Sequence, residues 1–249
     1  MKNYAVIQHN YSEFLGQIER QLEVRDIGFS YVRPFVGQDL PVNLLHYDAL
    51  FLLGGSTPPT DKEAAPWIDQ ELALIDMALK SKRPVIGLGF GGQLVAMRAG
   101  GAASGEPFHT GYWTTARATP AGKGDPLAQA VDGHRVLVLY NGKVDLPEDV
   151  EPIVVDEEGN WLAIRLEDLG YGLLFRPDLK PGMIEDMVME AHRETPDNIG
   201  DLLQTARTEW NETQKTTDQI IIALVKALDL MTERKKPPVF KLNVESDGE

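Results

Sequence analysis

The stretch that decides the fold of this chain runs Arg83-Pro84-Val85-Ile86-Gly87-Leu88-Gly89-Phe90-Gly91-Gly92-Gln93-Leu94. An apolar run ends there in a glycine cluster, and apolar residues then recur at helical spacing. The pattern predicts a strand, a tight turn and a helix, an arrangement that lifts one side chain to the top of a sheet as a nucleophile. The residue at the apex is Gly89. Because glycine has no side chain, this elbow carries no nucleophile.

Strands and helices are predicted to alternate on the N-terminal side of the elbow. Short apolar runs predict strands at 4–7, 29–33 and 49–53. Apolar residues at helical spacing predict helices at 12–24, with Ser12 as the N-cap, and at 66–79. Continuous apolar strands of this kind are typical of a parallel sheet that helices cover on both faces. The sequence therefore predicts an α/β fold, a three-layer sandwich with a mostly parallel central sheet.

The pattern changes after about residue 107. Short runs broken by Gly, Pro and Asp predict an antiparallel β excursion, with strands at 112–119, 135–140, 153–155, 161–165 and 171–175. Two apolar stripes then predict C-terminal helices, one from Ile199 to Trp210 and one from Asp218 to Met231. These stripes either dock onto the protein's own core or form a surface for a partner or a second copy of the chain. We divide the chain into residues 1–190, a helical extension at 191–236 and a polar tail at 237–249.

The composition excludes several classes of protein. The chain has 249 residues, of which 43% are hydrophobic and 25% charged, as in a soluble globular protein. A net charge of −14 argues against a nucleic-acid partner. No apolar run approaches the roughly 20 residues of a membrane span, and the N-terminus does not read as a signal peptide. Cysteine is absent and the five histidines lack metal-ligand spacing. We therefore expect a cytoplasmic protein with no metal and no cofactor.

Three separated blocks, in order, resemble the class I glutamine amidotransferases. Residues 53–56, Leu-Gly-Gly-Ser, are similar to the family's glycine loop, and residues 84–94 to its elbow, normally Gly-x-Cys-x-Gly-x-Gln. Residues 171–178, Tyr-Gly-Leu-Leu-Phe-Arg-Pro-Asp, are similar to its Phe-His-Pro-Glu block, and the segments 109–112 and 140–147 resemble two minor blocks. The resemblance covers roughly residues 3–190 and implies the flavodoxin-like fold of that family.

The chain departs from the family at the catalytic positions. Gly89 stands at the Cys position, Arg176 at the His position and Asp178 at the Glu position, and Asn141 replaces a His of another segment. Release of ammonia from glutamine needs a nucleophile, a base that accepts its proton and a group that holds the base. Arginine stays protonated and cannot act as a base. The departures therefore predict that the chain does not hydrolyse glutamine by the family's mechanism.

The resemblance also implies which residues surround the former glutamine site: Gly54, Gly55, Phe90, Gln93, His109, Tyr112, Asn141 and Arg176. Arg176, with Lys143 nearby, could bind a small carboxylate or a phosphate. In the alternative, which we favour, Arg176 pairs with Asp178 and Phe90 fills the pocket. We interpret His109 as a hydrogen-bonded strand residue.

These observations lead to one main hypothesis and two alternatives. The main hypothesis is an inactive amidotransferase-like protein, either an accessory or regulatory subunit of a ligase or synthetase or a small-molecule binder. The first alternative is hydrolysis of glutamine or a γ-glutamyl compound without a cysteine, with Asp178 as the base. The second is NAD(P) binding through Gly87–Gly92, which match Gly-x-Gly-x-x-Gly. The match does not lie in the first βα unit, and the next acidic residue is Glu106, which disfavours a dinucleotide site.

Overall fold

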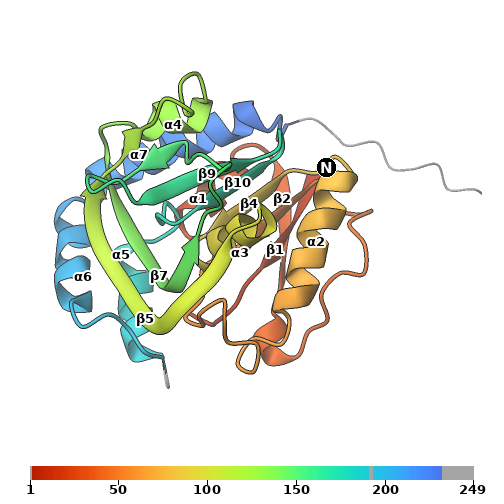
Figure 1. Cartoon of the computed structure of the whole chain (residues 1–249), viewed down its shortest axis with the longest axis horizontal. Helices are drawn as coiled ribbons and strands as arrows, with labels where there is room; N and C mark the ends of the chain where they lie inside the picture. Colours follow the sequence, from red (N-terminus) through yellow and green to blue (C-terminus); the bar gives the residue numbers. More distant parts are fainter. Residues whose placement is uncertain (1, 191–192, 232–249) are drawn as a thin grey trace, which may run out of the picture.

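A sheet of eight strands in the order β2-β1-β3-β4-β10-β9-β8-β6 forms the centre of the computed structural model (Figure 1), which describes residues 2–190 and 193–231, with backbone only at 105–108. Five neighbouring strands are parallel: β2 (Ile27–Val32), β1 (Lys2–Ile7), β3 (Ala49–Leu52), β4 (Val85–Leu88) and β10 (Gly170–Leu173). Three antiparallel strands complete the sheet: β9 (Trp161–Leu166), β8 (Val154–Val155) and β6 (Arg117–Ala118). The predicted mostly parallel α/β fold with antiparallel strands is confirmed.

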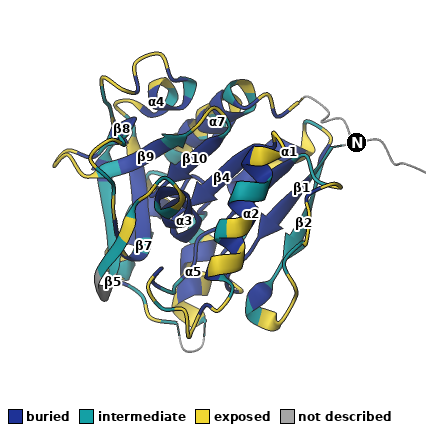
Figure 2. Cartoon of the chain, turned by 45° about the vertical axis from the view of Figure 1, so that its right-hand side comes forward, coloured by how far each residue is buried: buried dark blue, intermediate teal, exposed yellow. Residues whose placement is uncertain are grey.

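Helices cover both faces of the sheet because successive residues of each buried strand point to opposite sides. On one face, Tyr4 and Val6 pack with α1 (Gln17–Glu23), α4 (Pro126–Val131) and α7 (Trp210–Ala227). On the other, Ala5 and Ile7 pack with α2 (Ile68–Lys80) and α3 (Phe90–Arg98). Figure 2 shows the buried sheet between helices whose outer surfaces are exposed. Three layers follow directly from the alternation along β1.

A long antiparallel pair of strands, connected through β6 and α4 and termed the hairpin, covers the end of the sheet that carries the elbow. Its strands β5 (Ala102–Thr115) and β7 (Arg135–Asp145) pair with each other. Leu137 and Leu139 of β7 pack against α5 (Pro181–Met189) and α6 (Ile199–Thr208). The helices α6 and α7 therefore dock onto the body of the protein, as one of the two alternatives predicted. The division of the chain at residues 190 and 236 stays a prediction, and the tail at 237–249 lies outside the described residues.

Two local predictions were wrong. The first helix begins at Gln17 and not at Ser12, because Gly16 adopts a φ of 56° immediately before it. The Ser12 hydroxyl donates to Glu190 instead of capping a helix. The run at 171–175 is not purely antiparallel, since β10 pairs in parallel with β4 and antiparallel with β9. Among the described helices, none has the length and apolar character needed to cross a membrane.

Candidate functional site

The elbow turns at Gly89, between β4 and α3, with a φ of 53° and a ψ of −112°. A residue with a side chain rarely adopts this backbone conformation, whereas glycine adopts it freely. Around the turn, a methyl group at Gly87, Gly91 or Gly92 would overlap neighbouring backbone atoms. The glycine cluster thus lets the start of α3 pack directly onto the strands β3, β4 and β10. The predicted strand, turn and helix are present.

Replacing Gly89 with alanine is expected to destabilise the protein by about 1–3 kcal/mol through backbone strain. The added Cβ would lie 3.1 Å from Cδ of Arg176 and 3.2 Å from the carbonyl oxygen of Leu139, which adds crowding to the strain. Two alanine controls separate these causes: Gly133 has a positive φ in open space, and Gly182 has open space without a positive φ. Urea denaturation should rank the losses Gly89, then Gly133, then Gly182. An unchanged midpoint for Gly89→Ala would contradict the strained elbow.

The side chain of Arg176 lies beside the apex of the elbow and is buried. Its Nε and Nη2 donate to the two carboxylate oxygens of Asp178, at 2.9 and 2.6 Å, and its Nη1 donates to Oε1 of Glu13 at 2.7 Å. The guanidinium packs so closely on the glycine loop that a methyl group at Gly54 would overlap it. Bidentate pairing of this kind is strong and geometrically specific. Arg176 is therefore held by the protein's own carboxylates and fills the space in front of Gly89.

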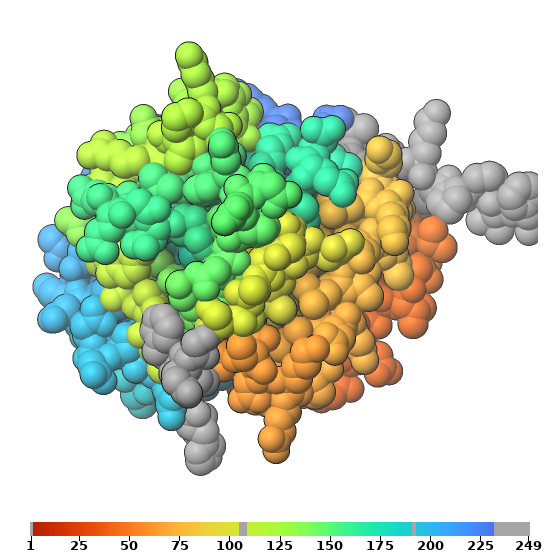
Figure 3. Space-filling view, in the orientation of Figure 1, coloured from red at the N-terminus to blue at the C-terminus, as the bar shows by residue number. Residues whose placement is uncertain are grey.

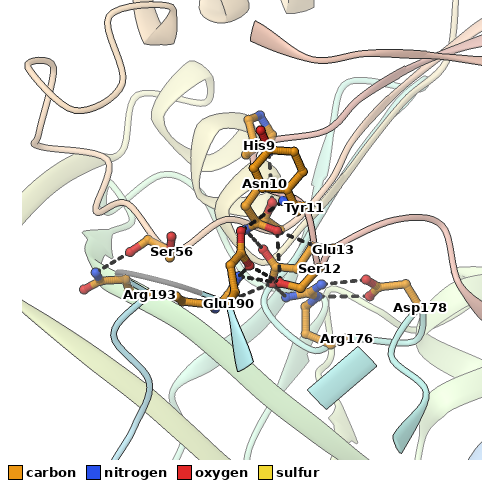
Figure 4. A network of polar contacts seen from close by, with 12 residues as sticks. His9, Asn10, Tyr11, Ser12, Glu13, Ser56, Arg176, Asp178, Glu190 and Arg193 are labelled. Atoms are coloured by element: carbon orange, nitrogen blue, oxygen red, sulfur yellow. Dashed lines mark hydrogen bonds and ion pairs between the residues drawn. The ribbon is translucent and has the colours of Figure 1, made fainter. Parts of the chain in front are cut away.

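A second arginine joins the cluster from the segment that follows α5 (Figure 4). The Nη2 atom of Arg193 lies 3.3 Å from Oε1 of Glu13. Its Nη1 donates to the hydroxyl of Ser12 at 3.0 Å and lies 3.4 Å from a carboxylate oxygen of Glu190. Burial opposes ionisation of Glu13, but Arg193 and Arg176 outweigh it and lower the pKa of Glu13 to about 2. Glu13 is therefore ionised at neutral pH. We call Glu13, Arg176, Asp178 and Arg193 the arginine clamp.

A buried His9–Glu71 pair lies on the opposite side of the glycine loop. The Nε2 atom of His9 lies 3.1 Å from Oε1 of Glu71, and its Nδ1 lies 3.0 Å from the carbonyl oxygen of Gly54. Burial disfavours the charged ring, but Glu71 and the Gly54 carbonyl together raise the pKa of His9. Because both ring nitrogens face acceptors, the ring is held as a double donor. His9 has no free nitrogen with which to act as a base at the elbow.

The structure separates the predicted site residues into two groups. Gly54, Gly55, Phe90, Asn141 and Arg176 lie around the elbow, where Asn141 donates to the carbonyl oxygen of Ser56. The cavity left between the glycine loop, Asn141 and the segment 193–199 is only about 10 Å³. That volume holds about one water molecule, whereas ligand pockets usually measure roughly 300–1,000 Å³. The elbow as it stands has no room for glutamine.

His109 lines the same small cavity as Gly55 and Asn141, with its Nε2 3.2 Å from a carboxylate oxygen of exposed Glu194. The other predicted residues lie farther along the hairpin or make other contacts. Tyr112 donates to Asp156 at 2.9 Å, on the inner side of the hairpin. Gln93 extends from α3 and donates to the carbonyl oxygen of Asn141 at 3.0 Å. Lys143 is exposed and pairs with Asp145, so it adds no charge to the elbow. That these residues bind a ligand stays a prediction.

The two alternative functions find no support in this geometry. Gly87, Gly91 and Gly92 are buried and are explained by close packing onto backbone, so they form no open cradle for a pyrophosphate. Both carboxylate oxygens of Asp178 accept hydrogen bonds from Arg176, which leaves this group unsuited to accept a proton from a substrate. The described residues contain no group of His, Asp or Glu that could hold a metal ion.

Two of the four residues of the clamp, Glu13 and Arg193, could not be predicted from the sequence. Glu13 fell within an incorrectly extended helix, and Arg193 lay outside the blocks that carry the resemblance. Both meet Arg176 only because the loop after β1 and the segment after α5 reach the same end of the sheet (Figure 4). No spacing in the sequence signals this meeting. Only in the structure does the complete burial of Glu13 indicate that a cation lies nearby, because acidic side chains are rarely buried unless they are paired.

A parallel sheet with a glycine elbow at the carboxyl ends of its strands is the fold that the resemblance to the glutamine amidotransferases predicts. Known proteins with similar sequence or structure support this fold. No family model matches the sequence. The glutamine amidotransferase-like protein YfeJ of Salmonella typhimurium is 24% identical over 198 residues, covering 78% of this chain and 83% of that protein. The chain is therefore similar in sequence to a glutamine amidotransferase-like protein.

Three solved structures show the same fold. A glutamine amidotransferase from Thermotoga maritima has a TM-score of 0.73 and 21% identity, covering 92% of this chain and 98% of that chain. A glutamine amidotransferase from Methylobacillus flagellatus has a TM-score of 0.75 and 21% identity, covering 97% and 99%. PurLQS from Thermotoga maritima has a TM-score of 0.54 and 14% identity, covering 92% and 100%. At these identities the likeness concerns the fold.

Proposed function

We propose that this chain is a glutamine amidotransferase-like protein that does not hydrolyse glutamine and acts by binding a partner enzyme as an accessory or regulatory subunit. The observation that carries the proposal is the arginine clamp, which fills the space in front of Gly89 with a buried guanidinium whose three nitrogens each donate to a carboxylate. Neither a nucleophile nor a base is available there. A small-molecule binder at the former glutamine site is the less favoured form, since the cavity there measures about 10 Å³.

Glutamate release from glutamine by the wild-type protein is expected to stay at the level of buffer. Gly89→Cys alone should remain inactive, because Arg176 leaves its thiol without a proton acceptor. Each protein is incubated with glutamine, glutamate is quantified over hours, and an active glutaminase serves as the positive control. Sustained release by the wild-type chain on the order of 1 s⁻¹ or faster, typical of enzymes, would overturn the proposal.

An apolar patch next to the clamp supports the choice of a partner protein. The side chains of Tyr11 and Met189 are 70% and 82% exposed, and Val188 and Val36 are about half exposed. The backbone N–H of Tyr11 donates to Glu190, and its ring lies edge-on to Phe35, which brings these segments together. Exposed apolar patches often mark interaction sites.

Substitution of Tyr11 and Met189 by serine is expected to remove a specific partner when the protein is purified from its native cells. The matched control is Ile222→Ser, which replaces an exposed apolar residue on α7. Quantitative mass spectrometry should recover one enzyme chain with the wild type and with the control, and lose it with the double variant. If the wild type recovers no stoichiometric partner, the accessory role is contradicted. The absence of glutamine hydrolysis would still stand, because it is measured separately.

A further inference from the structure

A cavity of about 800 Å³ lies away from the elbow, between the hairpin β5–β7 and the turn that joins β8 to β9. Its volume lies within the range of small-molecule sites, roughly 300–1,000 Å³. Figure 3 looks onto this face, where the yellow-green strand β5 and the green segments of β7 and of the turn before β9 lie side by side. Nothing in the arginine clamp contributes to its lining. The cavity is thus separate from the arginine clamp, although Gln93 and Tyr112, which the resemblance places around the former glutamine site, line it.

Aromatic side chains form much of its wall, and hydrogen bonds hold them in position. Tyr112 donates to Asp156 at 2.9 Å, and the indole N–H of Trp161 donates to the carbonyl oxygen of Val144, also at 2.9 Å. Tyr140 and Trp113 line the same space. A wall of fixed rings suits a ligand with an apolar or planar body. Because the rings are already held in place, little ordering is needed when a ligand binds.

The polar groups of the cavity are mainly hydrogen-bond acceptors. At its inner end Gln93 is wholly buried, and its Nε2 already donates to the carbonyl oxygen of Asn141. The Oε1 atom of Gln93 has no hydrogen-bond partner among the residues described. A buried amide oxygen of this kind calls for an N–H or O–H donor. Because Gln93 is wholly buried, a bound molecule or water reaches this oxygen only if the side chain or its neighbours shift.

The outer part of the cavity carries more negative than positive charge. Its lining includes the acidic residues Asp145, Glu157 and Glu158, and the sole basic residue in this lining is Lys143. Lys143 is already paired with Asp145. Asp156 is fixed by hydrogen bonds from the backbone of Glu158 and Asn160, so its charge adds to the same face. Aromatic rings together with carboxylates recognise organic cations, through attraction of the cation to the ring faces and direct ion pairing.

We propose that this cavity is a binding site for an organic amine in its ammonium form, whose apolar body lies between the aromatic rings and whose N–H groups reach the acceptors. The site is independent of the proposed function at the elbow. It selects against small carboxylates, which the carboxylates at the mouth would repel. The proposal therefore assigns the cavity a ligand of opposite charge to the one predicted for the former glutamine site.

The test uses the full chain and two probe amines, 2-phenylethylamine and n-hexylamine, with 3-phenylpropanoate as the anion of matched shape. Calorimetry and thermal melts at millimolar ligand should show saturable binding of at least one amine and a rise in melting temperature by mass action. The anion should cause neither. Absence of binding by both amines, or equal binding of the anion, would overturn the proposal.

Two variants test the residues named. Glu157→Gln with Glu158→Gln removes two exposed charges and should weaken amine binding several-fold, whereas Glu63→Gln, an exposed acid far along the chain, should not. Gln93→Met removes the unpartnered acceptor and should weaken binding about tenfold. If Gln93→Met fails to fold, the double variant of the exposed acids decides by itself. Unchanged affinity in the double variant would show that the amines bind elsewhere and refute the site.

Discussion

Arg176→Ala is expected to lower the free energy of unfolding by about 3–5 kcal/mol, because it leaves two buried carboxylates without their cation. Both Glu13 and Asp178 are essentially inaccessible to solvent, and Arg176 contacts both within 3 Å. Urea denaturation of the wild type and the variant measures the difference. The size of the loss distinguishes a structural clamp from an arginine kept available for a ligand.

Matched controls make this prediction specific. Arg207 forms an ion pair with Glu185 in which both side chains are about half exposed, so Arg207→Ala should cost less than about 1 kcal/mol. Combining Arg176→Met with Glu13→Gln and Asp178→Asn removes the carboxylate charges and should recover part of the loss. A loss from Arg176→Ala no larger than that from Arg207→Ala would mean that the clamp does not hold the fold together.

The stability of the wild type is expected to fall steeply in acid, with Glu13 contributing on the order of 3 kcal/mol. The pKa of Glu13 is lowered from 4.5 to about 2 in the folded protein. A lowered pKa stabilises the folded state fully above the unfolded value, and this contribution is lost as pH falls through the folded value. The relevant window therefore runs from pH 4.5 down to pH 2.

Glu13→Gln isolates this contribution. The variant lacks the titrating group, so the difference in free energy of unfolding between wild type and variant should shrink as pH falls through the window. Denaturation by urea at several pH values measures both proteins in the same buffers. Glu63→Gln, which removes an exposed carboxylate, serves as the control and should follow the wild type. A constant difference between wild type and Glu13→Gln would show that Glu13 is not ionised by the clamp.

The fold could be predicted from the sequence because its signals are local. Apolar runs mark the strands, and the glycine cluster marks the turn at Gly89, where the φ is indeed positive. The start of the first helix could not be predicted from the sequence. It depends on the conformation of Gly16 and on the Ser12 hydroxyl, which donates to Glu190 of a distant segment. Tertiary contacts overrode an ordinary N-cap signal there.

The site was predicted only in part, for the same physical reason. Arg176 and Asp178 stand two residues apart, so their pairing could be considered from the sequence, and the structure shows that pair. Glu13 lies 163 positions from Arg176 in the sequence, and only the fold brings the two residues together. The near absence of space at the elbow could not be foreseen either, because a cavity volume is set by how all the surrounding side chains pack.

The arginine clamp also affects whether single substitutions could restore a catalytic cysteine and histidine to this protein. A thiolate with an imidazole base would require Gly89→Cys and Arg176→His together. The first change alone places a side chain on a strained turn and against Arg176, and the second alone leaves Glu13 short of a cation. Each order of steps passes through a protein weakened by a sizeable part of a typical total stability of roughly 5–15 kcal/mol. The clamp thus disfavours a stepwise return to a catalytic cysteine and histidine, because each single substitution destabilises the protein before the other is made.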